Sequence, residues 1–460
     1  MSTAHDLLRI LKTWHKMPTG QLLERLGVSR ATLMRAVQSL GDQIVVRGRA
    51  RKTAYAARRA LRGSWHNLPL YRIDADGQAH EVSQLQLLYP AGCALDGVEQ
   101  LGWPLDASMR DGWFEGLPYF LDDMRPQGFL GRHFAARHAD VLQVGTDPRM
   151  WSEDDTLHAL CLLGHDMPGN LIVGEAAMRQ WLNISRQDPV ALRAHERVDA
   201  YPRLALEALQ HGVAGSSAGG EFPKFTAIRT IDGQAAHVIV KFSGSDGTPG
   251  AVRWSDLLVC EHLALAAVAA HLALPAAASQ LYQAAGRTFL EVARFDRHGA
   301  HGRSAVCSWQ ALNAALCGLA GKPWGEAGAA LRQLGLISAD VAAGLQRLGW
   351  FGRLIANTDM HDGNLSFRPG LKQALALAPV YDMLPMAYAP ARGMELPATV
   401  FVVSLPLPAE RDAWRAAAQA AEPFWNAASM DARISPGFRN ICASNAAAVA
   451  QALRKVPEFI

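Results

Sequence analysis

The sequence predicts an α+β protein: a two-lobed body, with an α+β first lobe and a mostly helical second lobe, follows a small basic domain. Residues 1–65 combine helical periods with an excess of basic side chains. A glycine-rich loop, strands and a helix alternate along 201–299, whereas the chain beyond 300 is rich in Ala and Leu at helical spacing. We place the domain boundaries at 1–65, 66–300 and 301–460.

Composition indicates a globular protein with room for two or three domains, since 50% of its 460 residues are hydrophobic and 19% are charged. Six scattered cysteines without a C-x-x-C pair favour free thiols in a reducing compartment and argue against structural zinc. Residues 1–20 lack the pattern of a signal peptide. The apolar run 263–280 is interrupted by Pro275 and is too short to cross a bilayer. We therefore expect a cytoplasmic protein that is not bound to a membrane.

Charge is unevenly distributed along the chain. Residues 1–65 contain thirteen Lys and Arg against three Asp and Glu, a net of +10, whereas the remainder carries −7. This asymmetry indicates a basic module joined to a nearly neutral body.

The basic module has the pattern of a helix-turn-helix. A helical period over 3–17 ends at Pro18, and a helix is expected over 21–26, with Thr19 or Gly20 as its cap. Ser29 then caps a third helix over 30–40. In a helix-turn-helix, the residues at the start of this last helix read base edges. They are Ser29, Arg30, Thr32, Leu33 and Arg35.

Two short strands are expected around the turn 48–51, which would form the wing of a winged helix-turn-helix. Arg49 in this wing would contact phosphates or a minor groove. The charge, the turn and the spacing together favour binding of double-stranded DNA, with association with the nucleoid and, for a palindromic site, a homodimer. The alternative is a small helical domain that binds proteins and has a solvated basic face.

The stretch 66–200 is expected to form a small α+β unit, because Gly and Pro residues separate short predicted strands and helices. It contains no motif that indicates a chemical function. The stretch 213–225 is a loop of small residues that contains Ser216, Ser217, Gly219 and Gly220. Such a loop lets backbone N–H groups approach phosphates. It lacks the order of a Walker loop, and a flexible linker is the alternative interpretation.

A strand over 237–242 ends at Lys241, as the nucleotide-binding lysine of protein kinases does. The helix expected over 257–274 would bring Glu261 within reach of Lys241, which is the ion pair that kinases use. For each residue taken alone, a solvated surface charge is the alternative.

The stretch 352–385 carries the strongest signal. Asp359 and Asn364 lie five residues apart before a short strand, and Asp382 follows a second apolar run. Protein kinases use this spacing for a catalytic Asp, a metal-binding Asn and a metal-binding Asp. The first carboxylate faces the acceptor hydroxyl, and the other two groups hold magnesium on the phosphates. A polar turn between buried strands is the alternative interpretation.

Several motifs together resemble the HipA family of Ser/Thr kinase toxins, over roughly 66–460. They are Ser216-Ser-Ala-Gly, Pro223-Lys-Phe, Ile239-Val-Lys, Glu291-Val-Ala-Arg-Phe-Asp-Arg, Asn357-Thr-Asp-Met-His-Asp-Gly-Asn and Val380-Tyr-Asp. With a winged helix in front, the chain is similar to the YjjJ-type branch. The resemblance implies a two-lobed kinase that uses ATP and Mg²⁺ to phosphorylate a serine on a protein, typically an aminoacyl-tRNA synthetase. It also implies a separate DNA-binding antitoxin in most members.

Carried over by position, the resemblance makes Asp359 the catalytic base, Asn364 and Asp382 the Mg²⁺ ligands, and Lys241 a contact of the ATP phosphates. The glycine-rich loop would also bind ATP, and Ser216 would be autophosphorylated. The chain departs from the family pattern at two places that are expected to bind the ATP phosphates. Gly363 stands where the family usually has Lys, and the loop before Lys224 is longer than usual.

Two other functions fit the same residues. One is a DNA-binding transcriptional regulator whose body is a pseudokinase. The presence of Asp359, Asn364 and Asp382 together argues against it, because a pseudokinase does not need all three. The other is a small-molecule phosphotransferase, which shares the same catalytic logic. The protein substrate and the DNA sequence are not predicted.

Overall fold

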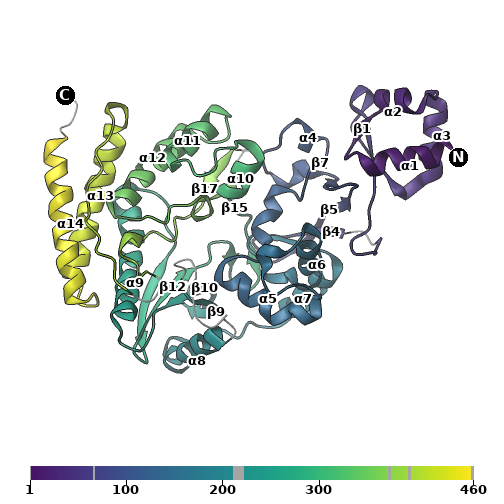
Figure 1. The fold of residues 1–460 in the computed structure, drawn as a ribbon. Helices are drawn as coiled ribbons and strands as arrows, with labels where there is room; N and C mark the ends of the chain where they lie inside the picture. Colours follow the sequence, from purple (N-terminus) through teal and green to yellow (C-terminus); the bar gives the residue numbers. More distant parts are fainter. Residues whose placement is uncertain (1, 66–67, 211–221, 371–373, 392–394, 457–460) are drawn as a thin grey trace. The chain divides into compact units, whose positions relative to one another are not determined.

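The computed structural model describes residues 2–65, 68–210, 222–370, 374–391 and 395–456 (Figure 1). Ser216, Ser217, Gly219 and Gly220 of the predicted glycine-rich loop lie outside these ranges. The chain divides into two compact units. The first unit contains residues 1–125 and 138–187, and the second contains 126–137 and 188–460. The division after residue 187 falls inside the predicted segment 66–300. The predicted boundaries at 65 and 300 do not coincide with it and stay predictions.

The first unit begins with three helices and a three-stranded antiparallel sheet, in strand order β1-β3-β2. The elements are α1 (Thr3–Thr13), β1 (Met17–Pro18), α2 (Thr19–Leu26), α3 (Arg30–Leu40), β2 (Ile44–Arg47) and β3 (Ala54–Ala57). Ser29 caps α3 by accepting the N–H of Thr32 at 3.2 Å, as predicted. Pro18, not Thr19 or Gly20, precedes the first turn of α2.

Leu33 was expected among the side chains at the start of α3 that read bases, and this is wrong. It is fully buried in a core with Leu7, Leu11 and Leu22. The helical period places Leu33 and Ala36 on one side of α3, and that side packs on α1. Arg30 and Arg35 lie on the exposed part of the helix.

Part of the basic charge of residues 1–65 is neutralised inside the first unit. Arg47 on β2 contacts Asp96 at 3.0 Å, and Arg59 contacts Asp154 at 2.7 Å. Arg62 forms a further ion pair with Asp155. These three arginines therefore contribute less to an outward-facing basic surface than the net charge suggests.

The remainder of the first unit is a five-stranded antiparallel sheet with helices beside it (Figure 1). The strand order is β7-β6-β5-β4-β8. Its strands are β4 (Leu68–Ile73), β5 (Ala79–Leu87), β6 (Cys93–Leu95), β7 (Trp113–Phe114) and β8 (Leu171–Val173), and its helices include α4 (Ala107–Arg110), α6 (Glu153–Leu163) and α7 (Glu175–Ser185). Trp181 and Met178 of α7 pack on Ile73 and Ile172 of the sheet. Helix α5 (Gly128–Leu142) runs from one unit into the other.

The second unit contains a four-stranded antiparallel sheet in the order β11-β12-β10-β9. The strands are β9 (Lys224–Ile231), β10 (Gln234–Phe242), β11 (Ser279–Ala284) and β12 (Arg287–Ala293). Helix α8 (Arg197–Gln210) is fastened to this sheet by the buried carboxylate of Glu291, which accepts hydrogen bonds from Arg197 and Tyr201 at 2.8 Å each. Arg229 of β9 completes this network at 3.2 Å.

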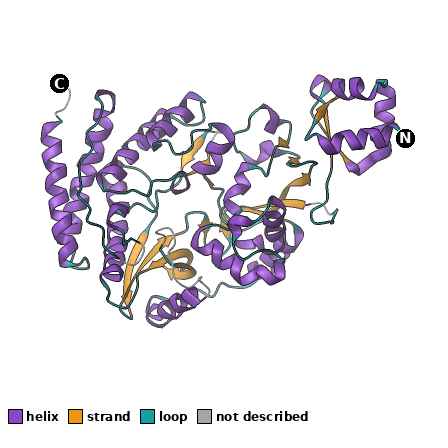
Figure 2. Cartoon of the chain, in the orientation of Figure 1, coloured by secondary structure: helices purple, strands orange, loops and turns teal. Residues whose placement is uncertain are grey.

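After β12 the regular structure is mainly helical, and Figure 2 shows how helices and strands are distributed over the chain. They are α10 (Trp309–Leu316), α11 (Trp324–Gln333), α12 (Ala339–Leu354), α13 (Arg411–Met430) and α14 (Pro436–Lys455). The strand pair β13 (Arg297–His298) and β14 (Gly302–Arg303) precedes these helices. A three-stranded sheet is formed by β15 (Cys307–Ser308), just before α10, and by β16 (Ser366–Pro369) and β17 (Leu375–Leu377), between α12 and α13. The chain thus has the mixed helix and sheet composition predicted from sequence.

Helix α9 (Pro249–Ala267), extended by a π-helical turn to Leu272, is long and apolar enough to cross a membrane. Its most apolar window has a mean hydropathy of 1.4, and 61% of that window is buried inside the protein. Burial of this kind is typical of a core helix.

Candidate active site

Lys241 lies near the end of β10, on the face of the sheet opposite to Val240 and Phe242, whose side chains enter the core. Its backbone pairs with Leu290 of β12 on one side and with Lys224 of β9 on the other. The side chain of Lys241 is only 7% exposed. A lysine buried this deeply needs carboxylate partners to stay charged.

Glu261 supplies one of these partners. Helix α9 places its fully buried carboxylate 2.6 and 2.8 Å from the Lys241 ammonium group. Burial raises the pKa of Glu261, and the positive charge of Lys241 acts in the opposite direction. Burial alone would lower the pKa of Lys241, but the carboxylates of Asp382 and Glu261 raise it. The structure therefore brings together the two residues that the sequence predicted to pair.

Asp382 is the second partner and forms an ion pair with the same ammonium group. Its backbone has a φ of +51°, which is uncommon for a residue other than glycine. Its side chain is 30% exposed. Burial would raise the pKa of Asp382, but the charges of Lys241 and Lys224 lower it, so the carboxylate is ionised at neutral pH.

The predicted catalytic loop begins just after α12. Asn357 accepts the N–H of Asp359 at 3.0 Å, which fixes the turn into the loop. The side-chain amide of Asn364 then donates to the carbonyl of Asp359 at 2.9 Å, across the loop. Asp359 itself is exposed, whereas Asn364 is buried. The loop thus presents the Asp359 carboxylate to solvent and holds Asn364 beneath it.

Tyr381 joins this loop to the segment that carries Asp382. Its hydroxyl donates to the carbonyl of Gly363 at 2.7 Å and lies 2.8 Å from the hydroxyl of Ser366. On the other side of the loop, Asp362 accepts a hydrogen bond from Asn313 at 3.1 Å. These hydrogen bonds connect the loop that carries Asp359 and Asn364 to Tyr381, the residue before Asp382.

The donor set fits magnesium. Since the amide nitrogen of Asn364 is used within the loop, its oxygen is left to act as a ligand. Asp382 adds an ionised carboxylate. Within the ranges that the structure describes, no group of three His, Cys, Asp or Glu side chains is placed to hold a metal. Mg²⁺ commonly takes one or two protein oxygens and completes its shell with substrate phosphates and water.

Sequence reasoning missed two residues near this site. Lys224 lies opposite Lys241 in the sheet, and its charge acts on both Glu261 and Asp382. His361 lies between Asp359 and Asn364, and its charge also acts on Asp382. Both residues lie inside motifs that resemble the HipA family, but a single Lys or His has no characteristic spacing that would mark it as functional.

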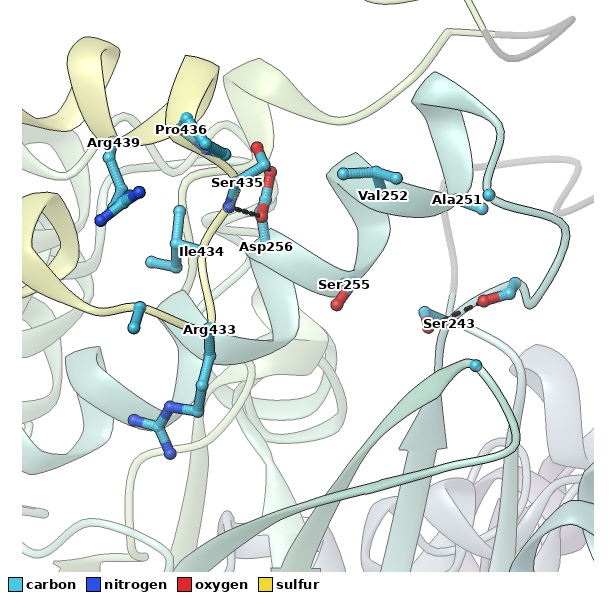
Figure 3. Close-up of a pocket in the computed structure, with 14 residues that line it drawn as sticks. Ser243, Ala251, Val252, Ser255, Asp256, Arg433, Ile434, Ser435, Pro436 and Arg439 are labelled. Atoms are coloured by element: carbon cyan, nitrogen blue, oxygen red, sulfur yellow. Dashed lines mark hydrogen bonds between the residues drawn. The ribbon is translucent and has the colours of Figure 1, made fainter.

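A separate pocket of about 320 Å³ lies at the N-terminal half of α9 (Figure 3). Ser243, Ser255, Asp256, Arg433 and Ser435 are among its lining residues. Asp256 accepts hydrogen bonds from the backbone N–H and the hydroxyl of Ser435, at 2.7 and 2.6 Å. These bonds connect α9 to the start of α14. Both oxygens of the Asp256 carboxylate therefore already accept hydrogen bonds from Ser435.

Comparison with known proteins identifies the family. A family model described as "HipA-like C-terminal domain" matches residues 216–453, and one described as "YjjJ-like toxin, middle domain" matches residues 64–182. The chain is 37% identical to "Toxin YjjJ" of Escherichia coli (strain K12) over 425 residues, which is 92% of each chain. The chain belongs to the HipA-like toxin family. The family expected from the sequence motifs is thereby confirmed.

Two solved structures are similar to this HipA-like chain. One is a complex of HipA, HipB and operator DNA from the toxin–antitoxin system of Shewanella oneidensis MR-1, with 15% identity, a TM-score of 0.49 and coverage of 85% of this chain and 96% of that one. The other is the proinflammatory kinase CtkA of Helicobacter pylori, with 14% identity, a TM-score of 0.36 and coverage of 53% and 92%.

Proposed function

We propose that this HipA-like toxin is a serine/threonine protein kinase that uses ATP and Mg²⁺ to phosphorylate a protein, which by family resemblance is an aminoacyl-tRNA synthetase. The observation that carries the proposal is the contact of Lys241 with both Glu261 and Asp382. A buried lysine held between a helix glutamate and a metal-binding aspartate is the arrangement that phosphoryl transfer by kinases requires.

Each residue then has a distinct role. Asn364 and Asp382 would hold Mg²⁺, which neutralises charge on the phosphates when it is bound. Lys241 would contact the phosphates while Glu261 keeps it in place. Asp359, exposed at the end of a fixed loop, would accept the proton of the substrate hydroxyl. Gly219, Gly220 and the two serines of the glycine-rich loop would cover the phosphates.

The test uses Asp359→Asn and Asp382→Ala with radiolabelled ATP and a cell lysate. Asp359→Asn should reduce phosphotransfer by ~10²–10⁴-fold, the usual worth of a general base, and leave ATP binding intact. Asp382→Ala should instead weaken Mg²⁺-dependent ATP binding. Labelling by Asp359→Asn at the wild-type rate would refute the kinase assignment. ATP binding without transfer by the wild type would favour the pseudokinase regulator, and labelled small molecules would favour the third function.

We further propose that residues 1–65 form a winged helix-turn-helix that binds double-stranded DNA. The supporting observation is the exposed start of α3, where Ser29, Arg30 and Arg35 reach solvent next to Thr32. Arg49, in the turn between β2 and β3, is exposed as well. A homodimer on a palindromic site, a separate antitoxin and a cytoplasmic location stay predictions of the sequence and of the family resemblance.

Gel shifts at several salt concentrations test DNA binding by the full chain. Affinity should fall steeply with salt, because bound phosphates release counterions. Arg30→Ala and Arg35→Ala should reduce discrimination between sequences, and Arg49→Ala should weaken all sites alike. Arg203→Ala, an exposed arginine on α8, is a matched control. Absence of binding at low salt would contradict the helix-turn-helix assignment.

A further inference from the structure

The chain between Asp382 and helix α13 contains an extended and uncharged stretch. Residues 395–407, all of which the structure describes, form no helix, turn or bend, and none of them has a positive φ. Between Glu395 and Glu410 the sequence L-P-A-T-V-F-V-V-S-L-P-L-P-A has no charged side chain. Its β-branched and aromatic residues are typical of a strand. Residues 396–405, which we call the exposed segment, nevertheless pair with no strand of the described chain.

Side chains of the exposed segment alternate between the protein and solvent. Thr399 and Phe401 are half-buried, whereas Val400 and Val402 are 84% and 76% exposed. Leu396 lies on the same outward side and is exposed as well. This period of two is that of a β-strand with one covered face. Exposed apolar side chains that gather on one face are typical of a site that binds another protein.

The backbone of the exposed segment is unpaired. Within the ranges that the structure describes, none of its N–H groups donates a hydrogen bond to another part of the protein. Natural proteins commonly protect such an edge with charges or proline, because it can pair with a strand of another chain. Pro397 and Pro406 stand at the two ends, but the eight residues between them include neither a charge nor a proline. An added strand would satisfy these backbone groups.

Two contacts with α13 hold the exposed segment in place. The ring of Phe401 packs on Trp425, with 5.9 Å between the ring centroids. The indole N–H of Trp414 donates to the carbonyl of Ser404 at 2.8 Å. Because the segment is already held in an extended form, a partner strand would not have to order it on binding.

A further contact connects the exposed segment to the predicted catalytic loop. The hydroxyl of Thr399 donates to the carbonyl of Ala387 at 2.8 Å, and the N–H of Ala387 donates to the carbonyl of Ala356 at 3.0 Å. Ala356 precedes Asn357, which accepts the N–H of Asp359. Two hydrogen bonds thus join the segment to the start of the loop that would face the acceptor hydroxyl.

We propose that the exposed segment binds an extended stretch of the protein substrate as an added β-strand, whose apolar side chains at alternate positions contact Val400 and Val402. The proposal rests on the kinase function proposed above. In this mode of binding, main-chain hydrogen bonds supply affinity, and the contacts of alternate side chains select the sequence. The exposed segment should therefore contribute to the affinity for the protein substrate and little to the affinity for ATP.

The substitutions Val400→Asp and Val402→Asp place a charge on the outward face and test the proposal in the full chain. With radiolabelled ATP and a dilute cell lysate, each variant should label the target about tenfold more slowly, since a buried valine contributes about that factor to binding. The loss should shrink in concentrated lysate, because substrate binding and not chemistry is impaired. ATP affinity should stay at the wild-type value. Val190→Asp, at another highly exposed valine of the second unit, is the matched control.

A synthetic peptide of about ten residues, in which Val and Ile alternate with Thr and Lys, gives a readout that needs no phosphotransfer. Its binding, followed by fluorescence anisotropy, should weaken about tenfold in Val400→Asp and Val402→Asp and stay unchanged in Val190→Asp. The same peptide with methyl groups on alternate amide nitrogens keeps its side chains but loses main-chain donors, and should bind more weakly to the wild type. Equal binding of the two peptides, or wild-type labelling by both aspartate variants, would overturn the proposal.

Hydrogen–deuterium exchange at residues 398–405 identifies what occupies the segment. These amides should exchange rapidly in the chain alone and slowly once the peptide is bound. Protection in the chain alone that rises with protein concentration would place a second copy on the segment and overturn the proposal. If the wild type labels no protein in the lysate, the kinase function fails. The peptide and the exchange measurement still decide in that case whether the segment accepts an added strand.

Discussion

Replacing Lys241 with methionine would leave the carboxylate of Glu261 buried without the ammonium group that it contacts at 2.6 and 2.8 Å. Methionine is close to the lysine stem in length, so packing should change little. A fully buried carboxylate without a partner takes up a proton instead of staying charged. Asp382 loses the same partner, but its side chain is 30% exposed and can remain hydrated.

The cost of this protonation sets the loss of stability. The ordinary pKa of a glutamate is 4.5. At about 1.4 kcal/mol per pH unit, holding Glu261 protonated costs about 3.4 kcal/mol at pH 7 and about 0.7 kcal/mol at pH 5. In the variant, the pKa of Glu261 is raised above its unfolded value. Its stability should therefore be highest at low pH and fall as the pH rises toward 7.

Urea unfolding followed by tryptophan fluorescence, at pH 5 and pH 7, measures the effect. Lys241→Met should lose about 3 kcal/mol relative to the wild type at pH 7 and under about 1 kcal/mol at pH 5. The double variant Lys241→Met with Glu261→Gln has no buried carboxylate at this position and should regain most of the loss. Equal losses at the two pH values, or no recovery in the double variant, would refute the reasoning.

Three further outcomes are expected. Burial lowers the pKa of His262 below 6.5, so stability should fall as the pH drops from 7 to 5.5, and His262→Asn should reduce this fall in thermal unfolding curves. Ser152→Ala removes the N-cap of α6 and should cost about 1 kcal/mol in urea unfolding, whereas Ser429→Ala, far from a helix start, should cost less. Intact mass should show a phosphate on Ser216 in the wild type and none in Asp359→Asn, together with weaker ATP binding by the modified protein.

Local patterns predicted the pieces of the candidate site but not all of its contacts. A strand that carries Lys241 near its end and a helix that carries Glu261 are both visible in the sequence, although α9 begins at Pro249 and not at 257 as predicted. The contact of the two residues was expected from the kinase order. The ion pair between Lys241 and Asp382 joins residues 141 positions apart. A contact at that separation depends on the packing of the whole second unit. The hydrophobic periodicity of a short stretch of sequence does not predict such packing.

Helix α3 shows a similar limit. The sequence indicated its start, its cap and its length, because these depend on neighbouring residues. Which side of the helix enters the core depends on how it packs on α1, and Leu33 was placed on the wrong side for that reason. The sheet of residues 68–173 was harder still, since β8 pairs with β4 across about a hundred residues.

Helix α9 is bonded at two points along its length. Its second half carries Glu261, which is bonded to Lys241, and its first half carries Asp256, which is bonded to the start of α14. Kinases that are switched by movement of the corresponding helix control activity by making and breaking the lysine–glutamate pair. A helix held at both points has little freedom to make that movement. We therefore expect the proposed kinase site to be assembled in a competent form once the chain folds, without a movement of α9 to switch it on.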